Sequence, residues 1–141
     1  MKLVIDSMYL IRLLCDEDMK DLVELIQGER MEAVVSPISL VEVYSVLARR
    51  DKARAGSYVE SLWASKLQIP GLTPPVITLS GDLKNNYQLH MSDAIIAATG
   101  ITSGARHVLT DDAHFKSVKN KIKPLNLQRC RKMLLKEGIR G

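Results

Sequence analysis

K-L-V-I-D, the stretch from Lys2 to Asp6, is typical of a buried β-strand that reaches the surface at an acid. Further short apolar strands are expected at Glu32–Val35, Val76–Leu79, His107–Thr110 and Leu125–Leu127. Helical patterns separate most of these strands. Strands that alternate with helices predict an α/β fold built on a mostly parallel sheet.

Capping residues and apolar spacing define the expected helices. Ser36 and Pro37 suit the N-cap and the first helical position, so a helix is expected from there through Arg50. The others are expected at Asp16–Gln27, at Asp51–Leu67 with a break at Gly56, from Ser80 through Leu89, at Asp93–Thr99 after a Ser92 cap, and at Gln128–Glu137. The prolines between Pro70 and Pro75 mark the one candidate linker in the sequence.

Length and composition indicate an ordinary globular protein. The 141 residues are 46% hydrophobic and 26% charged, which excludes disordered, collagen-like and coiled-coil classes and predicts a single domain over residues 1–141. No apolar run is long enough to span a bilayer. Cys15 and Cys130 have no metal-binding spacing, so we expect free thiols in a soluble cytoplasmic protein.

The net charge of +4 conceals two unlike parts. Residues 1–100 carry 10 Lys and Arg against 13 Asp and Glu, whereas residues 101–141 carry 10 against 3. Clustered basic residues raise the local potential for phosphate, but they also occur as solubilising tails. Both interpretations remain open on charge alone.

Several acids follow the predicted strands. In a parallel sheet, functional side chains gather outside the carboxyl ends of the strands, which is where Asp6, Asp111 and Asp112 fall. Asp93 opens a buried helix, and Glu42 lies in the second turn of another. Helix capping could explain Asp6, Asp93 and Asp112 singly, and Glu42 could be exposed or pair with Arg49.

Together these acids predict a metal site. Carboxylates that converge from distant segments repel one another and need a cation to compensate them. The three histidines have no ligand spacing to one another, so the donors are hard oxygens that suit Mg²⁺ or Mn²⁺. Such ions can activate water and stabilise the departing oxygen in phosphodiester cleavage, which is nuclease chemistry.

Four segments carry a resemblance that covers essentially the whole chain. They are V-I-D-S at Val4–Ser7, S-P-I-S-L-V-E-V at Ser36–Val43, S-D-A-I-I-A-A-T at Ser92–Thr99, and V-L-T-D-D-A-H-F at Val108–Phe115. In this order and spacing the chain resembles the PIN-domain ribonucleases, particularly the small single-domain VapC-type toxins. The resemblance implies a three-layer α/β/α sandwich that cleaves single-stranded regions of RNA with Mg²⁺ or Mn²⁺. It also implies a homodimer held by a cognate antitoxin.

The resemblance assigns roles residue by residue. Asp6, Glu42 and Asp93 match the three core acids of the family, and Asp112 matches the acid of a T-x-D element that begins at Thr110. Ser7 and Thr110 match supporting polar positions. The chain departs from the family pattern at three positions: Asp111 offers a second candidate for the fourth acid, Met8 replaces a small polar residue, and His114 stands where many relatives carry an acid.

The basic final third would bind RNA through phosphates, because the few aromatic residues are too scattered to form a stacking platform. The candidates are Lys116, Lys119, Lys121 and Lys123, followed by Arg129, Arg131 and Lys132. The alternatives are a PIN-fold module that processes RNA or binds it without catalysis, and a receiver-type phosphoacceptor domain. The receiver pattern fits less well, because the expected strand Val76–Leu79 lacks a terminal acid.

Overall fold

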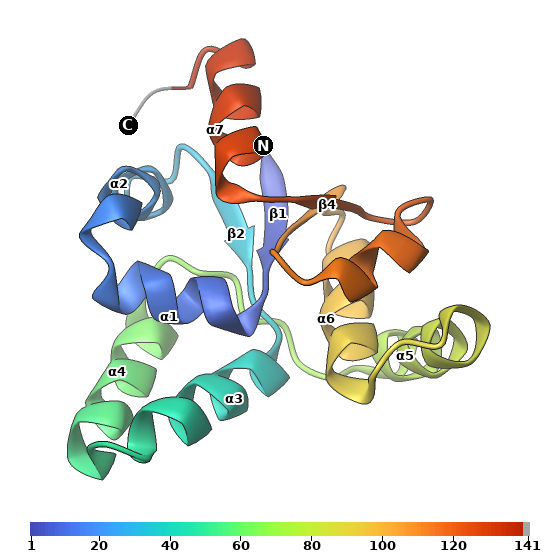
Figure 1. Cartoon of the computed structure of the whole chain (residues 1–141), viewed down its shortest axis with the longest axis horizontal. Coiled ribbons are helices and arrows are strands. Elements are labelled where there is room, and N and C mark those ends of the chain that lie inside the picture. The colour runs from blue at the N-terminus through green and yellow to red at the C-terminus, as the bar shows by residue number, and fades with distance from the viewer. Residues whose placement is uncertain (140–141) are drawn as a thin grey trace.

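The computed structural model describes residues 1–139 and places a parallel sheet between two helical layers (Figure 1). The sheet in this part has the order β2-β1-β3-β4. Its strands are β1 (Lys2–Ile5), β2 (Glu32–Val34), β3 (His107–Leu109) and β4 (Lys123–Leu125). The predicted α/β class and three-layer sandwich are confirmed, although residues 140 and 141 of the expected domain lie outside the described residues.

Helices cover both faces of this sheet. They are α1 (Ser7–Cys15), the 3₁₀ helix η1 (Glu17–Met19), α2 (Lys20–Gln27), α3 (Pro37–Ala48), α4 (Lys52–Ala64), α5 (Pro74–Tyr87), α6 (Met91–Thr102), the 3₁₀ helix η2 (Ala113–Val118) and α7 (Leu127–Lys136). None of those within residues 1–139 has the length and apolarity needed to cross a bilayer. Because successive strand residues point to opposite faces, Leu3 and Ile5 pack with α1, α2 and α7, whereas Val4 packs with α5 and α6.

The contact between α6 and β1 is unusually close at Gly100. A Cβ atom at this position would lie 2.6 Å from Val4 Cγ1 and 2.9 Å from Ile122 Cδ1, so a side chain cannot fit there without rearrangement. Asp93 lies two turns earlier on the same helix. Close packing of α6 on the sheet therefore fixes the position of the first turn that carries Asp93.

The expected strand at Val76–Leu79 is wrong, and so is the helix start at Ser80. These residues belong to α5, which begins after Thr73 with two prolines in its first turn. Val76, Ser80 and Leu83 form its buried face at helical spacing, and Ser80 Oγ donates to the Val76 carbonyl at 2.7 Å inside the helix. The prolines prefer the first helical turn, and packing outweighs the β-propensity of V-I-T-L.

Other boundaries also differ from the prediction. Helix α1 was not expected as a separate element, and the predicted helix Asp16–Gln27 consists of η1 followed by α2. Gly56 does not interrupt α4. Helix α6 begins at Met91 with His90 as N-cap, and the last strand ends at Leu125 instead of starting there. The basic helix expected at Gln128–Glu137 is confirmed as α7, shifted by one residue.

Candidate metal centre

Acids from four separate segments surround one cavity of about 350 Å³. It lies at the carboxyl ends of β1 and β3, which are adjacent strands of the sheet. The chain leaves β1 into α1 on one face and leaves β3 into η2 on the other, so the cavity lies where connections diverge. Its lining includes Asp6, Ser7, Met8, Tyr9, Arg12, Glu42, Asp93, Asp111 and Asp112.

Asp6 is the most constrained of these acids. Its backbone N–H continues the sheet by donating to the Leu109 carbonyl at 3.2 Å, and its side chain caps α1 by accepting from Tyr9 N–H at 3.2 Å. Thr110 Oγ1 donates to its second carboxylate oxygen. Burial raises the pKa of Asp6, although the hydrogen bonds from Thr110 and Tyr9 oppose this shift. The fold thus holds a desolvated carboxylate in one orientation.

Glu42 reaches the cavity from α3, which packs against α1. Ser7 Oγ donates to Glu42 Oε1 at 2.6 Å, so Ser7 rather than Arg49 is the polar partner of this acid. The hydrogen bond occupies one oxygen of the carboxylate. The other oxygen remains available to a cation or to water in the cavity.

Asp93 and Asp112 approach from α6 and from the N-cap of η2. Burial raises the pKa of Asp93, and the negative charges of Asp112 and Glu42 raise it further, while His90 and His114 act in the opposite direction. Ligand atoms of Asp93, Asp112 and His114 all lie within 4.8 Å of one another. These groups are therefore close enough to feel a common cation.

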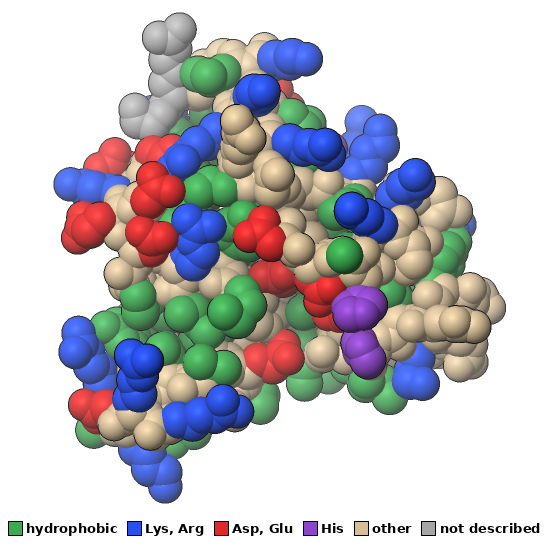
Figure 2. All heavy atoms as spheres, viewed as in Figure 1, with side chains coloured by type: hydrophobic (Ala, Val, Ile, Leu, Met, Phe, Trp, Pro, Cys, Tyr) green, Lys and Arg blue, Asp and Glu red, His purple; other side chains and the backbone are tan. Residues whose placement is uncertain are grey.

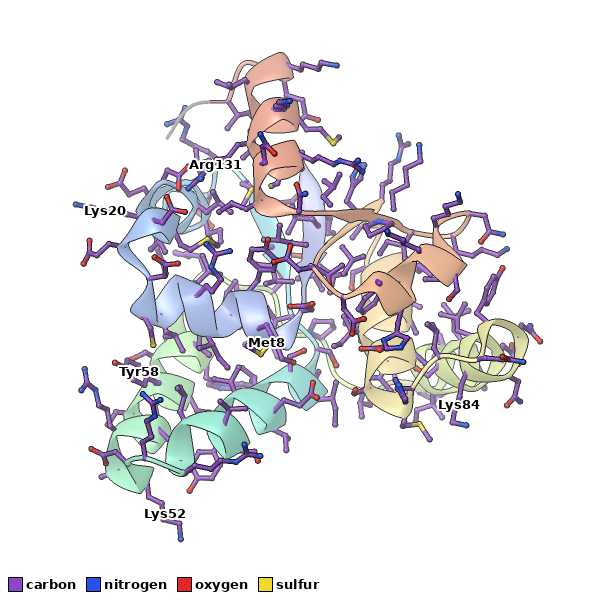
Figure 3. All side chains as sticks on the ribbon, viewed as in Figure 1. Met8, Lys20, Lys52, Tyr58, Lys84 and Arg131 are labelled. Carbon is purple, nitrogen blue, oxygen red and sulfur yellow. The ribbon has the colours of Figure 1, made fainter. Side chains whose placement is uncertain are left out.

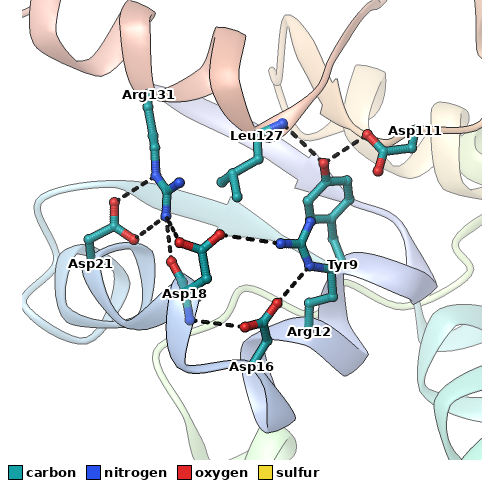
Figure 4. A network of polar contacts seen from close by, with 8 residues as sticks. All are labelled: Tyr9, Arg12, Asp16, Asp18, Asp21, Asp111, Leu127 and Arg131. Carbon is teal, nitrogen blue, oxygen red and sulfur yellow. Dashed lines mark hydrogen bonds and ion pairs between the residues drawn. The ribbon is translucent and has the colours of Figure 1, made fainter.

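The two neighbouring acids Asp111 and Asp112 have different partners. Tyr9 OH donates to Asp111 Oδ1 at 2.8 Å and accepts from Leu127 N–H at 3.0 Å, so Asp111 is tied toward the start of α7 (Figure 4). Asp112 N–H donates to Thr110 Oγ1 at 2.9 Å, which links it to the threonine that also holds Asp6. Asp112, unlike Asp111, is therefore linked through Thr110 to the carboxylate of Asp6.

Basic side chains lie beside the acids (Figure 2). A hollow of about 560 Å³ is lined by Lys116, Lys119, Asn120, Lys123, Pro124 and Arg129. A second hollow of about 340 Å³, which includes Lys119, Lys121 and Lys123, lies with His107 at the amino ends of β3 and β4 and so at the opposite edge of the sheet from the acids. Arg131 was expected to bind RNA, but its contacts in the structure are with acids of the protein itself. Its guanidinium donates twice to Asp21 at 3.0 Å and pairs with Asp18, so it fastens α7 to α2 instead of facing a ligand (Figure 4).

Sequence reasoning gave Tyr9, His90 and His114 no role in the site. Tyr9 had no expected role, because helix α1 was not predicted and the residues on its buried face were therefore not identified. His90 and His114 are far apart in sequence, yet their rings meet edge to face with centroids 5.0 Å apart. Met8 is 62% exposed at the rim, where Figure 3 shows it between α1 and α3. Because Met8 is exposed, an apolar side chain at this position removes no buried polar contact.

The donor set fits a hard divalent cation. Asp6, Glu42, Asp93 and Asp112 present carboxylates without a Lys or Arg between them. The one arginine in the lining, Arg12, pairs with Asp16 at 3.1 Å and with Asp18 at 3.5 Å. Carboxylate oxygens of this kind are the donors that Mg²⁺ and Mn²⁺ prefer, so these residues could hold such an ion.

The PIN domain family model matches residues 3–121, and the chain belongs to this family. This membership removes the receiver-type alternative. No curated protein sequence matches the chain.

Several solved structures share this fold. VapBC2 of Rickettsia felis, bound to a DNA fragment from its promoter, has a TM-score of 0.70 and 18% identity over 89% of this chain and 98% of that one. VapC20 of Mycobacterium tuberculosis, described as a sarcin–ricin loop cleaving toxin, has a TM-score of 0.66 and 14% identity over 86% and 97%. A toxin–antitoxin complex from Klebsiella pneumoniae has a TM-score of 0.61 and 18% identity over 87% and 95%. At these identities the likeness concerns the fold.

Proposed function

We propose that the chain is a single PIN-type nuclease domain that cleaves phosphodiester bonds in RNA with Mg²⁺ or Mn²⁺. The observation that carries this proposal is the convergence of four carboxylates on one cavity with no free basic side chain among them. Asp6, Glu42, Asp93 and Asp112 would hold the metal. Ser7 and Thr110 would orient two of these acids through the hydrogen bonds described above.

When bound, a divalent cation would lower the pKa of a water and stabilise the departing oxygen of the phosphodiester. The chain supplies the geometry for this chemistry. Asp6 is fixed by Thr110 and Tyr9, so its carboxylate needs little reorganisation. Glu42 has one oxygen held by Ser7 and one free, which suits a group that binds the metal or orients the attacking water.

The substrate class is proposed from the basic surface of the last third of the chain. Lys116, Lys119, Lys121 and Lys123 would hold the phosphate backbone along a surface that extends from η2 to the amino ends of β3 and β4, with Arg129 in the same hollow as Lys116. A chain gripped through phosphates is recognised with little base stacking, which agrees with the scattered aromatic residues. Arg131 is left out of this group because it is engaged with Asp21.

We further propose that the protein acts in the cytoplasm as the toxin of a toxin–antitoxin pair, as a homodimer with a cognate antitoxin. The likeness to VapBC2 and to the Klebsiella complex supports this role. The free thiols Cys15 and Cys130 agree with a reducing compartment. Val41 and Tyr44 expose 61% and 39% of their surface on α3, which offers apolar area for a partner.

The decisive experiment compares RNA cleavage by the wild type with that by Asp6→Asn and Asp93→Asn. Structured and single-stranded RNAs are incubated with Mg²⁺ or Mn²⁺, and products are resolved by length. We expect each substitution to lower the rate by roughly 10²–10³-fold, because a charge that stabilises the reaction is removed. Asp82→Asn is the matched control, since Asp82 is an exposed acid on α5 outside the cavity.

Three outcomes would contradict the proposal. Cleavage that survives both substitutions, or that persists in EDTA, would mean that the four acids and their metal do not perform the reaction. Tight RNA binding without turnover and without divalent-ion binding would instead indicate the noncatalytic alternative.

A further inference from the structure

His114 lies beside the proposed metal site, where its ring nitrogen Nδ1 contacts Asp112. We propose that His114 provides a nitrogen ligand to the metal, together with Asp93 and Asp112, and thereby gives the site a preference for Mn²⁺ and other transition ions over Mg²⁺. This inference rests on the proposed function, because it concerns the same metal site. It changes which ion the site selects.

The spacing of the three groups permits a shared ion. One ligand atom from each of Asp93, Asp112 and His114 lies within 4.8 Å of the others. Ligands about 2.1 Å from one ion are at most about 4.2 Å apart, so a small side-chain movement brings the set into range. His114 can make this movement, because its side chain is 61% exposed.

The contact between His114 and Asp112 places two ligand atoms at a spacing that suits one ion. His114 Nδ1 lies 2.7 Å from Asp112 Oδ1, and two ligands that are each about 2.1 Å from an ion can lie this close together. A cation between Nδ1 and Oδ1 would take the place of the proton that these two atoms share, and the ring would then bind the ion through the lone pair of Nδ1.

A second histidine restricts the orientation of this ring. His90, the N-cap of α6, meets His114 edge to face at 83° with ring centroids 5.0 Å apart. Figure 2 shows histidine side chains directly beside acidic ones. His114 therefore contacts an acid through Nδ1 and a neighbouring ring through its face or edge, which reduces the entropy lost on binding an ion.

Ligand chemistry explains the expected selectivity. Mg²⁺ prefers oxygen donors and gives up its waters reluctantly, whereas imidazole suits the divalent transition metals. An all-carboxylate site would discriminate weakly between Mg²⁺ and Mn²⁺. One imidazole in place of a carboxylate strengthens the binding of Mn²⁺ relative to Mg²⁺.

The test uses the full chain and measures metal binding without relying on RNA cleavage. Pulsed EPR of the Mn²⁺-loaded protein detects coupling to a directly bound ¹⁴N nucleus, and calorimetry gives the affinities for Mn²⁺ and Mg²⁺. We expect the ¹⁴N coupling in the wild type and its loss in His114→Gln. The Mn²⁺ affinity of this variant should fall by roughly 10–100-fold, while the Mg²⁺ affinity changes much less.

Two further variants sharpen the result. His107→Gln is the matched control, because His107 begins β3 at the end of the strand opposite to Asp112, and this variant should keep both the coupling and the affinities. His114→Asp restores an oxygen donor, so it should bind Mg²⁺ at least as well as the wild type and lose the preference for Mn²⁺.

The outcomes separate this inference from the proposed function. Mn²⁺ binding without ¹⁴N coupling in the wild type, or coupling that persists in His114→Gln, would overturn the role of His114 and leave the carboxylate site intact. Failure of the wild type to bind either ion would overturn the metal site itself, and the proposed function with it.

Discussion

Two groups of acids in this molecule have opposite electrostatic surroundings. Asp16, Asp18 and Asp21 lie around η1 and α2, where Arg12 and Arg131 compensate them (Figure 4). The Asp16 carboxylate accepts a hydrogen bond from Asp18 N–H and contacts the guanidinium of Arg12, and both interactions lower the pKa of Asp16. Burial raises the pKa of Asp21, but hydrogen bonds and charge from Arg131 outweigh it and lower the pKa overall.

The acids of the cavity have no such partners. Asp6 and Asp93 have raised pKa values, mainly because burial disfavours the charged form; the negative charge of Asp112 adds substantially to the shift of Asp93 and only slightly to that of Asp6. An acid that pairs with an arginine therefore stabilises the fold. Acids that lie together without an arginine destabilise the fold until a cation binds to them. Substitutions in the two groups should therefore have different consequences.

The largest expected effect separates Asp112 from its neighbour Asp111. Asp112→Asn should lower kcat/KM for RNA cleavage by roughly 10²–10³-fold, because Asp112 lies within reach of Asp93. Asp111→Asn should lower it by less than about tenfold, since Asp111 is held by Tyr9 and an amide oxygen can still accept that hydrogen bond. Cleavage rates of both purified variants at matched metal concentration make this comparison. A larger loss in Asp111→Asn would reverse the assignment of the fourth acid.

The next effect concerns metal-dependent stability. At a metal concentration of 100 times Kd, binding stabilises the fold by about 2.7 kcal/mol, which corresponds to a rise in Tm of roughly 10 °C for a domain of this size. Differential scanning calorimetry should show this rise for the wild type and a much smaller one for Asp93→Asn. Asp21→Asn should retain the full rise, because Asp21 lies outside the cavity. An equal rise in both variants would place the stabilising ion elsewhere.

The sequence could predict the site better than it could predict the whole fold. Asp6 and Asp112 follow strands of a parallel sheet, and the rule for carboxyl ends locates them without any knowledge of loops. The prediction of secondary structure failed where local propensity and tertiary packing favour different structures. V-I-T-L before Ser80 favours a strand, but the two prolines of the first turn and the buried spacing of Val76 and Leu83 make it a helix.

Contacts between distant segments were beyond the reach of the sequence. Tyr9 and Asp111 are 102 residues apart, and nothing in either segment indicates that a hydrogen bond will join them. The same holds for His90 and His114, whose contact depends on how the start of η2 is placed near the N-cap of α6. Arg131 resembled its basic neighbours in sequence, and its pairing with Asp21 becomes visible only when α7 is placed beside α2.

The smallest expected effect is the pH dependence of the free energy of unfolding in the metal-free protein, which should differ between the two groups of acids. Asp21 has a folded pKa below its ordinary value of 3.8, so its contribution to stability is present above that value and is lost as pH falls through the folded pKa. Asp93 has a folded pKa above 3.8, so folding favours its protonated form, and stability is lost as pH rises from 3.8 through the folded pKa. The two acids therefore act in opposite directions in adjoining pH ranges.

Urea unfolding in EDTA from pH 3 to 7 measures both contributions. Asp21→Asn should lower the free energy of unfolding at pH 7 by about 0.2–1 kcal/mol, the range for a solvent-exposed ion pair, since the Asp21 side chain is 42% exposed. Asp93→Asn should leave this free energy unchanged or raise it, because the variant removes a desolvated charge that repels Asp112 and Glu42. If Asp93→Asn destabilised the metal-free protein as much as Asp21→Asn does, the charge of Asp93 would already be compensated by the protein itself. The cavity would then hold a carboxylate that the fold itself satisfies, and the need for a cation would rest on Asp6, Glu42 and Asp112 alone.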